Sequence, residues 1–165
     1  MTKKMDAELT TLCYIERNGQ YLMLHRTKKK NDPSKDLWMG VGGHFELGES
    51  PDECVVREIR EETGLTLTNY CLRGIVSFSE GDWHEYMFLY SADEFCGELT
   101  ECSEGDLLWV DKEKAVNELI SWEGDKIFLR LMQQNYPCFS LKLHYENRRL
   151  CSAVLNGKPY YPESY

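Results

Sequence analysis

Residues 43 to 65 read Gly-His-Phe-Glu-Leu-Gly-Glu-Ser-Pro-Asp-Glu-Cys-Val-Val-Arg-Glu-Ile-Arg-Glu-Glu-Thr-Gly-Leu, and this is the most informative stretch of the chain. Ser50 can cap the start of a helix, Pro51 suits the first helical position, and Glu53 can complete a capping box with Ser50. Gly64 suits the left-handed residue that follows a helix end. The sequence therefore predicts a helix at about 51 to 62.

Three glutamates of this helix are spaced so that they share one helix face: Glu58, Glu61 and Glu62. Like charges at this spacing repel, and a hard divalent cation bound by carboxylate oxygens would offset the repulsion. Mg²⁺ suits such a site, Mn²⁺ can substitute for it, and the carbonyl of Gly42 is a candidate further ligand. Arg57 is expected to orient a glutamate by ion pairing, with Glu49 in the same network. The alternative is a solvated, glutamate-rich surface helix.

The full spacing from Gly43 to Leu65 is G-x5-E-x7-R-E-U-x-E-E-x-G-U, where U is aliphatic. This pattern resembles the Nudix box, the signature of enzymes that hydrolyse nucleoside diphosphates linked to another group. The resemblance implies an α/β/α sandwich around a mixed β-sheet, and attack of a metal-activated water on a phosphate anhydride. It also implies a glutamate base, for which Glu61 is favoured, with Glu62 and Glu104 as alternatives.

Three further stretches are similar to the MutT group of this family, whose members hydrolyse 8-oxo-dGTP to the monophosphate and pyrophosphate: residues 37–43, 103–110 and 121–126. This resemblance places Glu104 at a metal-ligand position, and Trp122 and Asp125 against the purine. An indole can pack on a purine, and a buried carboxyl can pair with its N–H edge. The alternatives are a core or loop anchor for Trp122 and a helix-capping or first-turn acid for Asp125.

Two residues depart from the pattern of the animal enzymes. Met39 stands where they have an asparagine that reads the base, and Gly124 where they have the first of two aspartates. Methionine can line an apolar wall but cannot read a hydrogen-bonding edge. Trp38 is a further candidate for the pocket border, with core packing as its alternative.

The expected substrate is therefore 8-oxo-dGTP or a related oxidised or canonical purine deoxynucleoside triphosphate, which implies nucleotide-pool sanitation. ADP-ribose or a dinucleoside polyphosphate is the alternative within the family. A non-catalytic nucleotide-binding module is a third hypothesis, and the retention of Glu58, Glu61 and Glu62 counts against it.

Composition narrows the class of protein. A chain of 165 residues fits one domain, taken here as 1–165. The net charge of −9 argues against a partner that is a nucleic acid polymer, although cations can still bridge to a phosphorylated ligand. There is no apolar run long enough for a membrane span and no visible secretory signal, which predicts a cytoplasmic location. The seven cysteines include Cys13, Cys54 and Cys71 in apolar patterns, and we expect buried, reduced thiols.

The rest of the chain reads mainly as strands, with a hairpin turn at Asn18-Gly19. The expected strands are 10–16, 20–26, one or two within 65–79, 85–91, 106–111, 139–145 and 150–155. Helices are expected at 112–120 and 125–134. By itself, this pattern supports only an α+β or α/β fold.

Overall fold

The computed structural model describes residues 6–161, and over this range ten strands and three helices follow one another. The strands are β1 Glu8–Arg17, β2 Gln20–Arg26, β3 Trp38–Met39, β4 Val41–His44, β5 Thr66–Glu80, β6 Trp83–Cys96, β7 Gly105–Asp111, β8 Phe139–Glu146, β9 Arg149–Leu155 and β10 Lys158–Pro159. The helices are α1 Pro51–Thr63, α2 Lys112–Asn117 and α3 Asp125–Gln133. Residues 1–5 and 162–165 of the predicted single domain lie outside the described residues.

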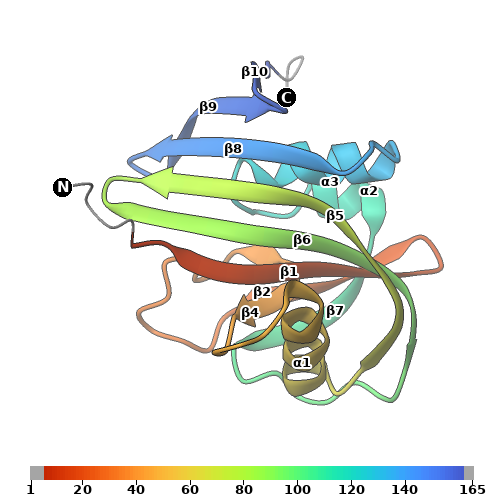
Figure 1. The fold of residues 1–165 in the computed structure, drawn as a ribbon. Helices are drawn as coiled ribbons and strands as arrows, with labels where there is room; N and C mark the ends of the chain where they lie inside the picture. The colour runs from red at the N-terminus through yellow and green to blue at the C-terminus, as the bar shows by residue number, and fades with distance from the viewer. Residues whose placement is uncertain (1–5, 162–165) are drawn as a thin grey trace.

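The strands form a mixed sheet in the order β10-β9-β8-β5-β6-β1-β2-β3, with β4 paired to β1 and β7 paired to β2. β1 runs parallel to β6 and β5 runs parallel to β8, whereas the remaining pairs are antiparallel. Figure 1 shows α1 in front of this sheet and α2 with α3 at its other face. The predicted sandwich around a mixed sheet is therefore confirmed.

Alternation along β1 explains the two layers, because successive side chains of a strand point to opposite faces. Leu12 and Tyr14 join the cluster that contains Phe128 of α3. Cys13 and Ile15 join the cluster that contains Val55 and Ile59 of α1. Each helix thus buries its apolar face against one side of the same strand.

The edge of β1 changes its partner along its length. Glu16 and Arg17 pair with β2, whereas residues 10–13 pair with β4. β2 and β4 therefore diverge from a common strand. Residues from β1, β2 and β4 line one pocket of the described chain, so this divergence positions the candidate site.

Several local expectations are confirmed and others need correction. The Asn18-Gly19 turn has the two positive φ angles of a tight hairpin, at 51° and 74°. The helix expected at 112–120 ends at Asn117, and the short strands β3, β4 and β10 were not predicted. All seven cysteines are free, but the expectation of buried thiols holds only for Cys13, Cys54 and Cys102. The other four are exposed: Cys71, Cys96, Cys138 and Cys151. Within residues 6–161, no helix is both long and apolar enough to cross a membrane.

Candidate active site

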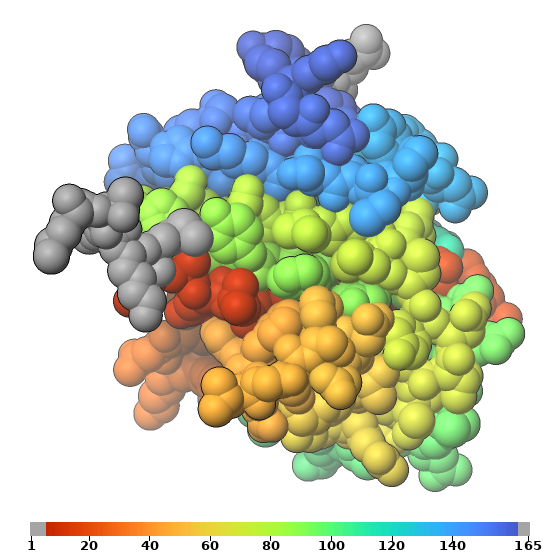
Figure 2. Space-filling model, in the orientation of Figure 1, coloured from red at the N-terminus to blue at the C-terminus, as the bar shows by residue number. Residues whose placement is uncertain are grey.

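Helix α1 is held at both ends by the residues that predicted it. The hydroxyl of Ser50 accepts from the backbone N–H of Glu53 at 3.1 Å, and the Glu53 carboxylate accepts from the backbone N–H of Ser50 at 2.8 Å. Gly64 ends the helix at φ 79°. Figure 2 shows the segment around residues 40–60, orange to yellow, at the surface of the face in view, so this part of the molecule is accessible from solvent.

Arg57 is the centre of an ion-pair network in front of the helix. Its guanidinium donates to Glu49 at 2.5 and 3.0 Å, to Glu58 at 2.9 Å and to Glu61 at 3.1 Å, as predicted from the sequence. It also donates to the backbone carbonyl of His44 at 2.9 Å, which ties α1 to the end of β4. Hydrogen bonds from Arg57, and then from the backbone of Glu46, lower the pKa of Glu49 to about 2. Glu49 is therefore fixed as a carboxylate that orients the arginine.

Gly43 lets the carboxylate of Glu58 lie directly against the backbone of β4. A Cβ at position 43 would lie 2.5 and 2.6 Å from the two carboxylate oxygens of Glu58, closer than real contacts allow. Burial raises the pKa of Glu58, an effect that its ion pair with Arg57 opposes. Carboxylate oxygens are ligands that suit a hard divalent cation.

Substitution of Gly43 by alanine is expected to lower metal-dependent activity by about 10–100-fold, the range seen when the support of a metal ligand is lost. The added methyl group would displace the Glu58 carboxylate while the capping of α1 remains intact. Activity titrated against Mg²⁺ would measure the effect. In the double variant with Glu58→Gln, Gly43→Ala should add little, because both changes act through one carboxylate. Additive losses would contradict this explanation.

The other predicted ligands are held apart by separate partners. Glu62 accepts a hydrogen bond from the thiol of Cys102 at 2.9 Å. Glu104, just before β7, pairs with Arg26 and Lys29, each at 2.9 Å. Within residues 6–161, no group of three or more acidic, histidine or cysteine side chains is gathered closely enough to hold a metal ion. The oxygen donors suit a hard cation, but the carboxylates would have to exchange their present partners to surround one.

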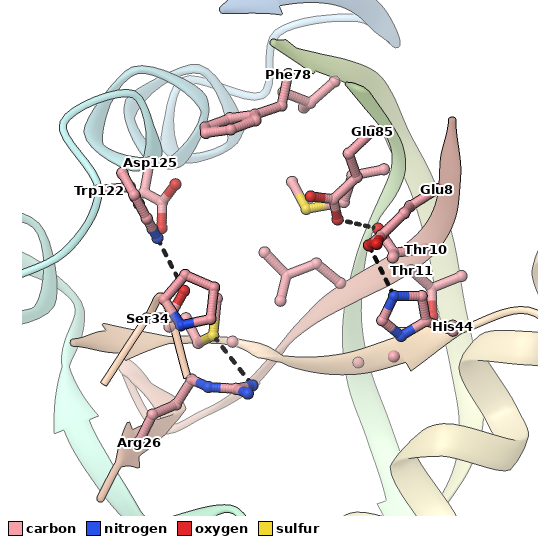
Figure 3. A pocket seen from close by; sticks show the side chains of 18 of the residues that line it. Glu8, Thr10, Thr11, Arg26, Ser34, His44, Phe78, Glu85, Trp122 and Asp125 are labelled. Atoms are coloured by element: carbon pink, nitrogen blue, oxygen red, sulfur yellow. Dashed lines mark hydrogen bonds and ion pairs between the residues drawn. The ribbon is translucent and has the colours of Figure 1, made fainter. Parts of the chain in front are cut away.

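A pocket of about 490 Å³ lies beside these residues, between α3 and the sheet. Its lining brings together the first glycine of the box and the glycine before it, a basic side chain, and polar, apolar and aromatic groups from distant segments: Arg26, Met39, Gly42, Gly43, Phe78, Glu85, Trp122 and Asp125. Figure 3 shows Trp122 and Asp125 on one side of this cavity and Glu85, Thr10 and His44 on the other. The pocket thus adjoins the box at Gly42 and Gly43.

Asp125 opens α3 and is 8% exposed, and its Oδ2 atom is buried with no hydrogen-bond partner among the described residues. Burial, and then the negative charge of Glu85, raises the pKa of Asp125 to about 8. The carboxyl therefore carries a proton at neutral pH, so it can both donate and accept. A buried polar atom without a partner points to a ligand that would satisfy it.

Trp122 is held in place by polar and aromatic contacts. Its indole N–H donates to Ser34 at 2.9 Å, and its ring meets Phe78 and Tyr145 edge-on. The guanidinium of Arg148 lies 4.8 Å from the ring centroid. The indole is therefore fixed at the pocket wall, as a packing platform requires.

The two remaining predicted substrate contacts differ in position. Met39 lines the pocket, and its sulfur lies 3.8 Å from the Arg26 guanidinium. Trp38 does not belong to the lining; its ring stacks on His25 with centroids 4.4 Å apart. Neighbouring residues of a strand point to opposite faces, which explains why one lies in the pocket and the other does not. Glu85 was missed because a single acid at the start of an apolar strand resembles an ordinary exposed strand end.

The raised pKa of Asp125 makes a prediction about stability. An acid with a folded pKa of about 8 and an unfolded value near 4 stabilises the fold fully below about pH 4, and this contribution is lost as pH rises through 8. Between pH 4 and 9, the free energy of unfolding of Asp125→Asn, relative to that of the wild type, should therefore rise by on the order of a few kcal/mol. Denaturant unfolding at several pH values would measure this. The exposed Asp106→Asn is the control, and a difference that does not change with pH would contradict the buried, protonated state.

Comparison with known proteins agrees with this geometry. A model of the NUDIX domain matches residues 8–132. The chain belongs to the Nudix hydrolase family. It is 30% identical to a MutT mutator protein of Bacillus halodurans whose crystal structure superposes with a TM-score of 0.81, covering 92% of this chain and 99% of that one.

Curated Nudix relatives carry several different names. The uncharacterized Nudix hydrolase YvcI of Bacillus subtilis is 35% identical over 61% of this chain, a match that spans only 64% of that protein. An ADP-ribose pyrophosphatase of Methanocaldococcus jannaschii is 34% identical, over 67% of this chain and 71% of that protein. An oxidized purine nucleoside triphosphate hydrolase of Danio rerio is 29% identical, over 78% and 81%. These relatives belong to one family, but their names indicate different substrates.

Proposed function

We propose that this Nudix protein hydrolyses purine deoxynucleoside triphosphates, with 8-oxo-dGTP as the preferred substrate, to the monophosphate and pyrophosphate. One observation carries the proposal: Gly43, the first residue of the box, and the preceding Gly42 line the same pocket as Trp122 and Asp125. A nucleotide with its base against Trp122 and Asp125 can therefore extend its phosphates toward the glutamates of α1. The similarity to the Danio rerio hydrolase supports the same choice.

The proposed chemistry assigns a role to each group. Glu58, Glu62 and Glu104, with the carbonyl of Gly42, would hold Mg²⁺ or Mn²⁺, which would activate water and neutralise the phosphates. Glu61 is proposed as the base, and it is the most open of the ion-paired glutamates around Arg57 that belong to α1, with a side chain 54% exposed. Arg57 orients Glu58 and Glu61 rather than touching substrate.

The base end of the pocket would be read by Asp125 and Trp122. The Asp125 carboxyl can accept a hydrogen bond from N1–H or the C2 amino group of a guanine, and such a contact would give the buried Oδ2 a partner. The indole can pack on the ring. Met39 contributes an apolar wall. We also propose a cytoplasmic location, where such a substrate pool is found.

The test is a hydrolysis panel of 8-oxo-dGTP, dGTP, dATP and ADP-ribose with Mg²⁺, with the products identified. We expect pyrophosphate and the monophosphate from 8-oxo-dGTP at the highest kcat/KM. Preferred cleavage of ADP-ribose would replace the proposal with the activity named for the Methanocaldococcus jannaschii relative. Tight nucleotide binding without any product would instead indicate a non-catalytic module.

A further inference from the structure

A second carboxylate faces the pocket from the wall opposite Asp125. Glu85 lies on β6 at the start of its pairing with β1, and it lines the cavity. The hydroxyl of Thr10 donates to Glu85 Oε1 at 2.5 Å, which orients the carboxylate from the neighbouring strand. Figure 3 shows Glu85 and Asp125 on opposite sides of the open space.

Glu85 and Asp125 line one cavity and interact electrostatically. Burial raises the pKa of Glu85, and the charge of Glu85 is the second cause of the raised pKa of Asp125. A carboxylate is an acceptor with about four lone-pair sites, and Thr10 uses one of them. Glu85 can therefore accept further hydrogen bonds, whereas the protonated Asp125 can both accept and donate.

The shape of a purine determines what Glu85 would meet. The N1 and C2 edge lies on one side of the ring system, and the N7 and C8 edge lies on the other. A purine whose N1 and C2 edge is paired with Asp125 thus presents N7 to the opposite wall. In guanine, N7 is an acceptor, so a carboxylate there would face a lone pair. In an 8-oxopurine, N7 carries a hydrogen and is a donor.

We propose that Glu85 is a specificity-determining residue that accepts a hydrogen bond from N7–H of an 8-oxopurine and disfavours the N7 lone pair of an unmodified purine. The inference rests on the proposed function and names how that site would select its substrate. It assigns to Glu85, oriented by Thr10, the reading that Met39 cannot perform. Glu85 on β6, rather than Met39 on β3, would then discriminate between oxidised and unmodified purines.

The test compares Glu85→Gln with the wild type on 8-oxo-dGTP and dGTP. The amide keeps the size of the side chain and an oxygen for Thr10, and its NH₂ group can donate to N7 of dGTP. The kcat/KM ratio of 8-oxo-dGTP to dGTP is expected to fall about tenfold or more, as for loss of one hydrogen bond to a charged group. Glu94→Gln, an exposed acid on the same strand, should leave the ratio unchanged.

A probe on the wild type makes the test independent of how the variant folds. In 7-deaza-dGTP a C–H group replaces the N7 lone pair, so the wild type should cleave it more efficiently than dGTP. Two outcomes would overturn the role of Glu85 while leaving the proposed function intact. One is a folded Glu85→Gln that hydrolyses 8-oxo-dGTP with an unchanged kcat/KM ratio of 8-oxo-dGTP to dGTP. The other is equal kcat/KM of the wild type for 7-deaza-dGTP and dGTP. Failure of the wild type to cleave any triphosphate would overturn the proposed function as well.

Discussion

Replacement of Glu61 by glutamine is expected to lower kcat by about 10²–10⁴-fold, the usual contribution of general acid–base catalysis. The amide keeps the shape of the side chain but cannot take a proton from the attacking water. KM should change little, because Glu61 is exposed on α1 and does not belong to the pocket lining. Steady-state kinetics on 8-oxo-dGTP would measure both values.

The comparison with the neighbouring acids decides the assignment. Glu62→Gln and Glu104→Gln should raise the Mg²⁺ requirement, because these residues are proposed as ligands rather than as the base. Glu94→Gln, exposed on β6, controls for loss of a surface charge. If Glu61→Gln turns over normally and Glu62→Gln is inactive at saturating Mg²⁺, the base is Glu62.

Removal of divalent cations is expected to abolish hydrolysis, and added Mg²⁺ should restore it. The chain has a net charge of −9, and a triphosphate adds further negative charge next to Glu58, Glu61 and Glu62. Without a cation the phosphates would be repelled and the water would not be activated. Product release after treatment with EDTA and after readdition of Mg²⁺ or Mn²⁺ would measure the effect.

A thermal shift gives a second readout that does not depend on turnover. An ion that binds only the folded chain raises the free energy of unfolding by about 2.7 kcal/mol at 100 times its dissociation constant. The shift should shrink in Glu58→Gln, because that carboxylate lies against the Gly43 backbone at the centre of the proposed site. Full activity after exhaustive chelation would disprove the metal requirement.

Much of the active-site helix followed from local sequence. The Ser50 and Glu53 capping box and the left-handed Gly64 are decided by backbone hydrogen bonds between near neighbours, so they were predictable. The ion pair of Arg57 with Glu61 arises from the i,i+4 spacing on one helix. The strands β1 and β2 were also predictable, because their Asn18-Gly19 turn is a local signal.

The lining of the pocket depends on long-range packing instead. No local pattern shows that Glu85 and Asp125 face each other, because parallel pairing of β1 with β6 and docking of α3 bring them to one cavity. The same holds for Glu62 beside Cys102 and Glu104 beside Arg26, where the partners lie far apart in the chain.

The Nudix box, its capped helix and the expectation of a bound cation therefore came from residue order alone, since all three depend on spacing within one helix and its loop. Which side chains line the pocket depends on the packing of distant segments. This packing placed Met39 inside and Trp38 outside, and it buried Asp125 so that its pKa rises to about 8. Burial and strand pairing are properties of the whole fold, and they set both the charge and the position of the groups that would read the base.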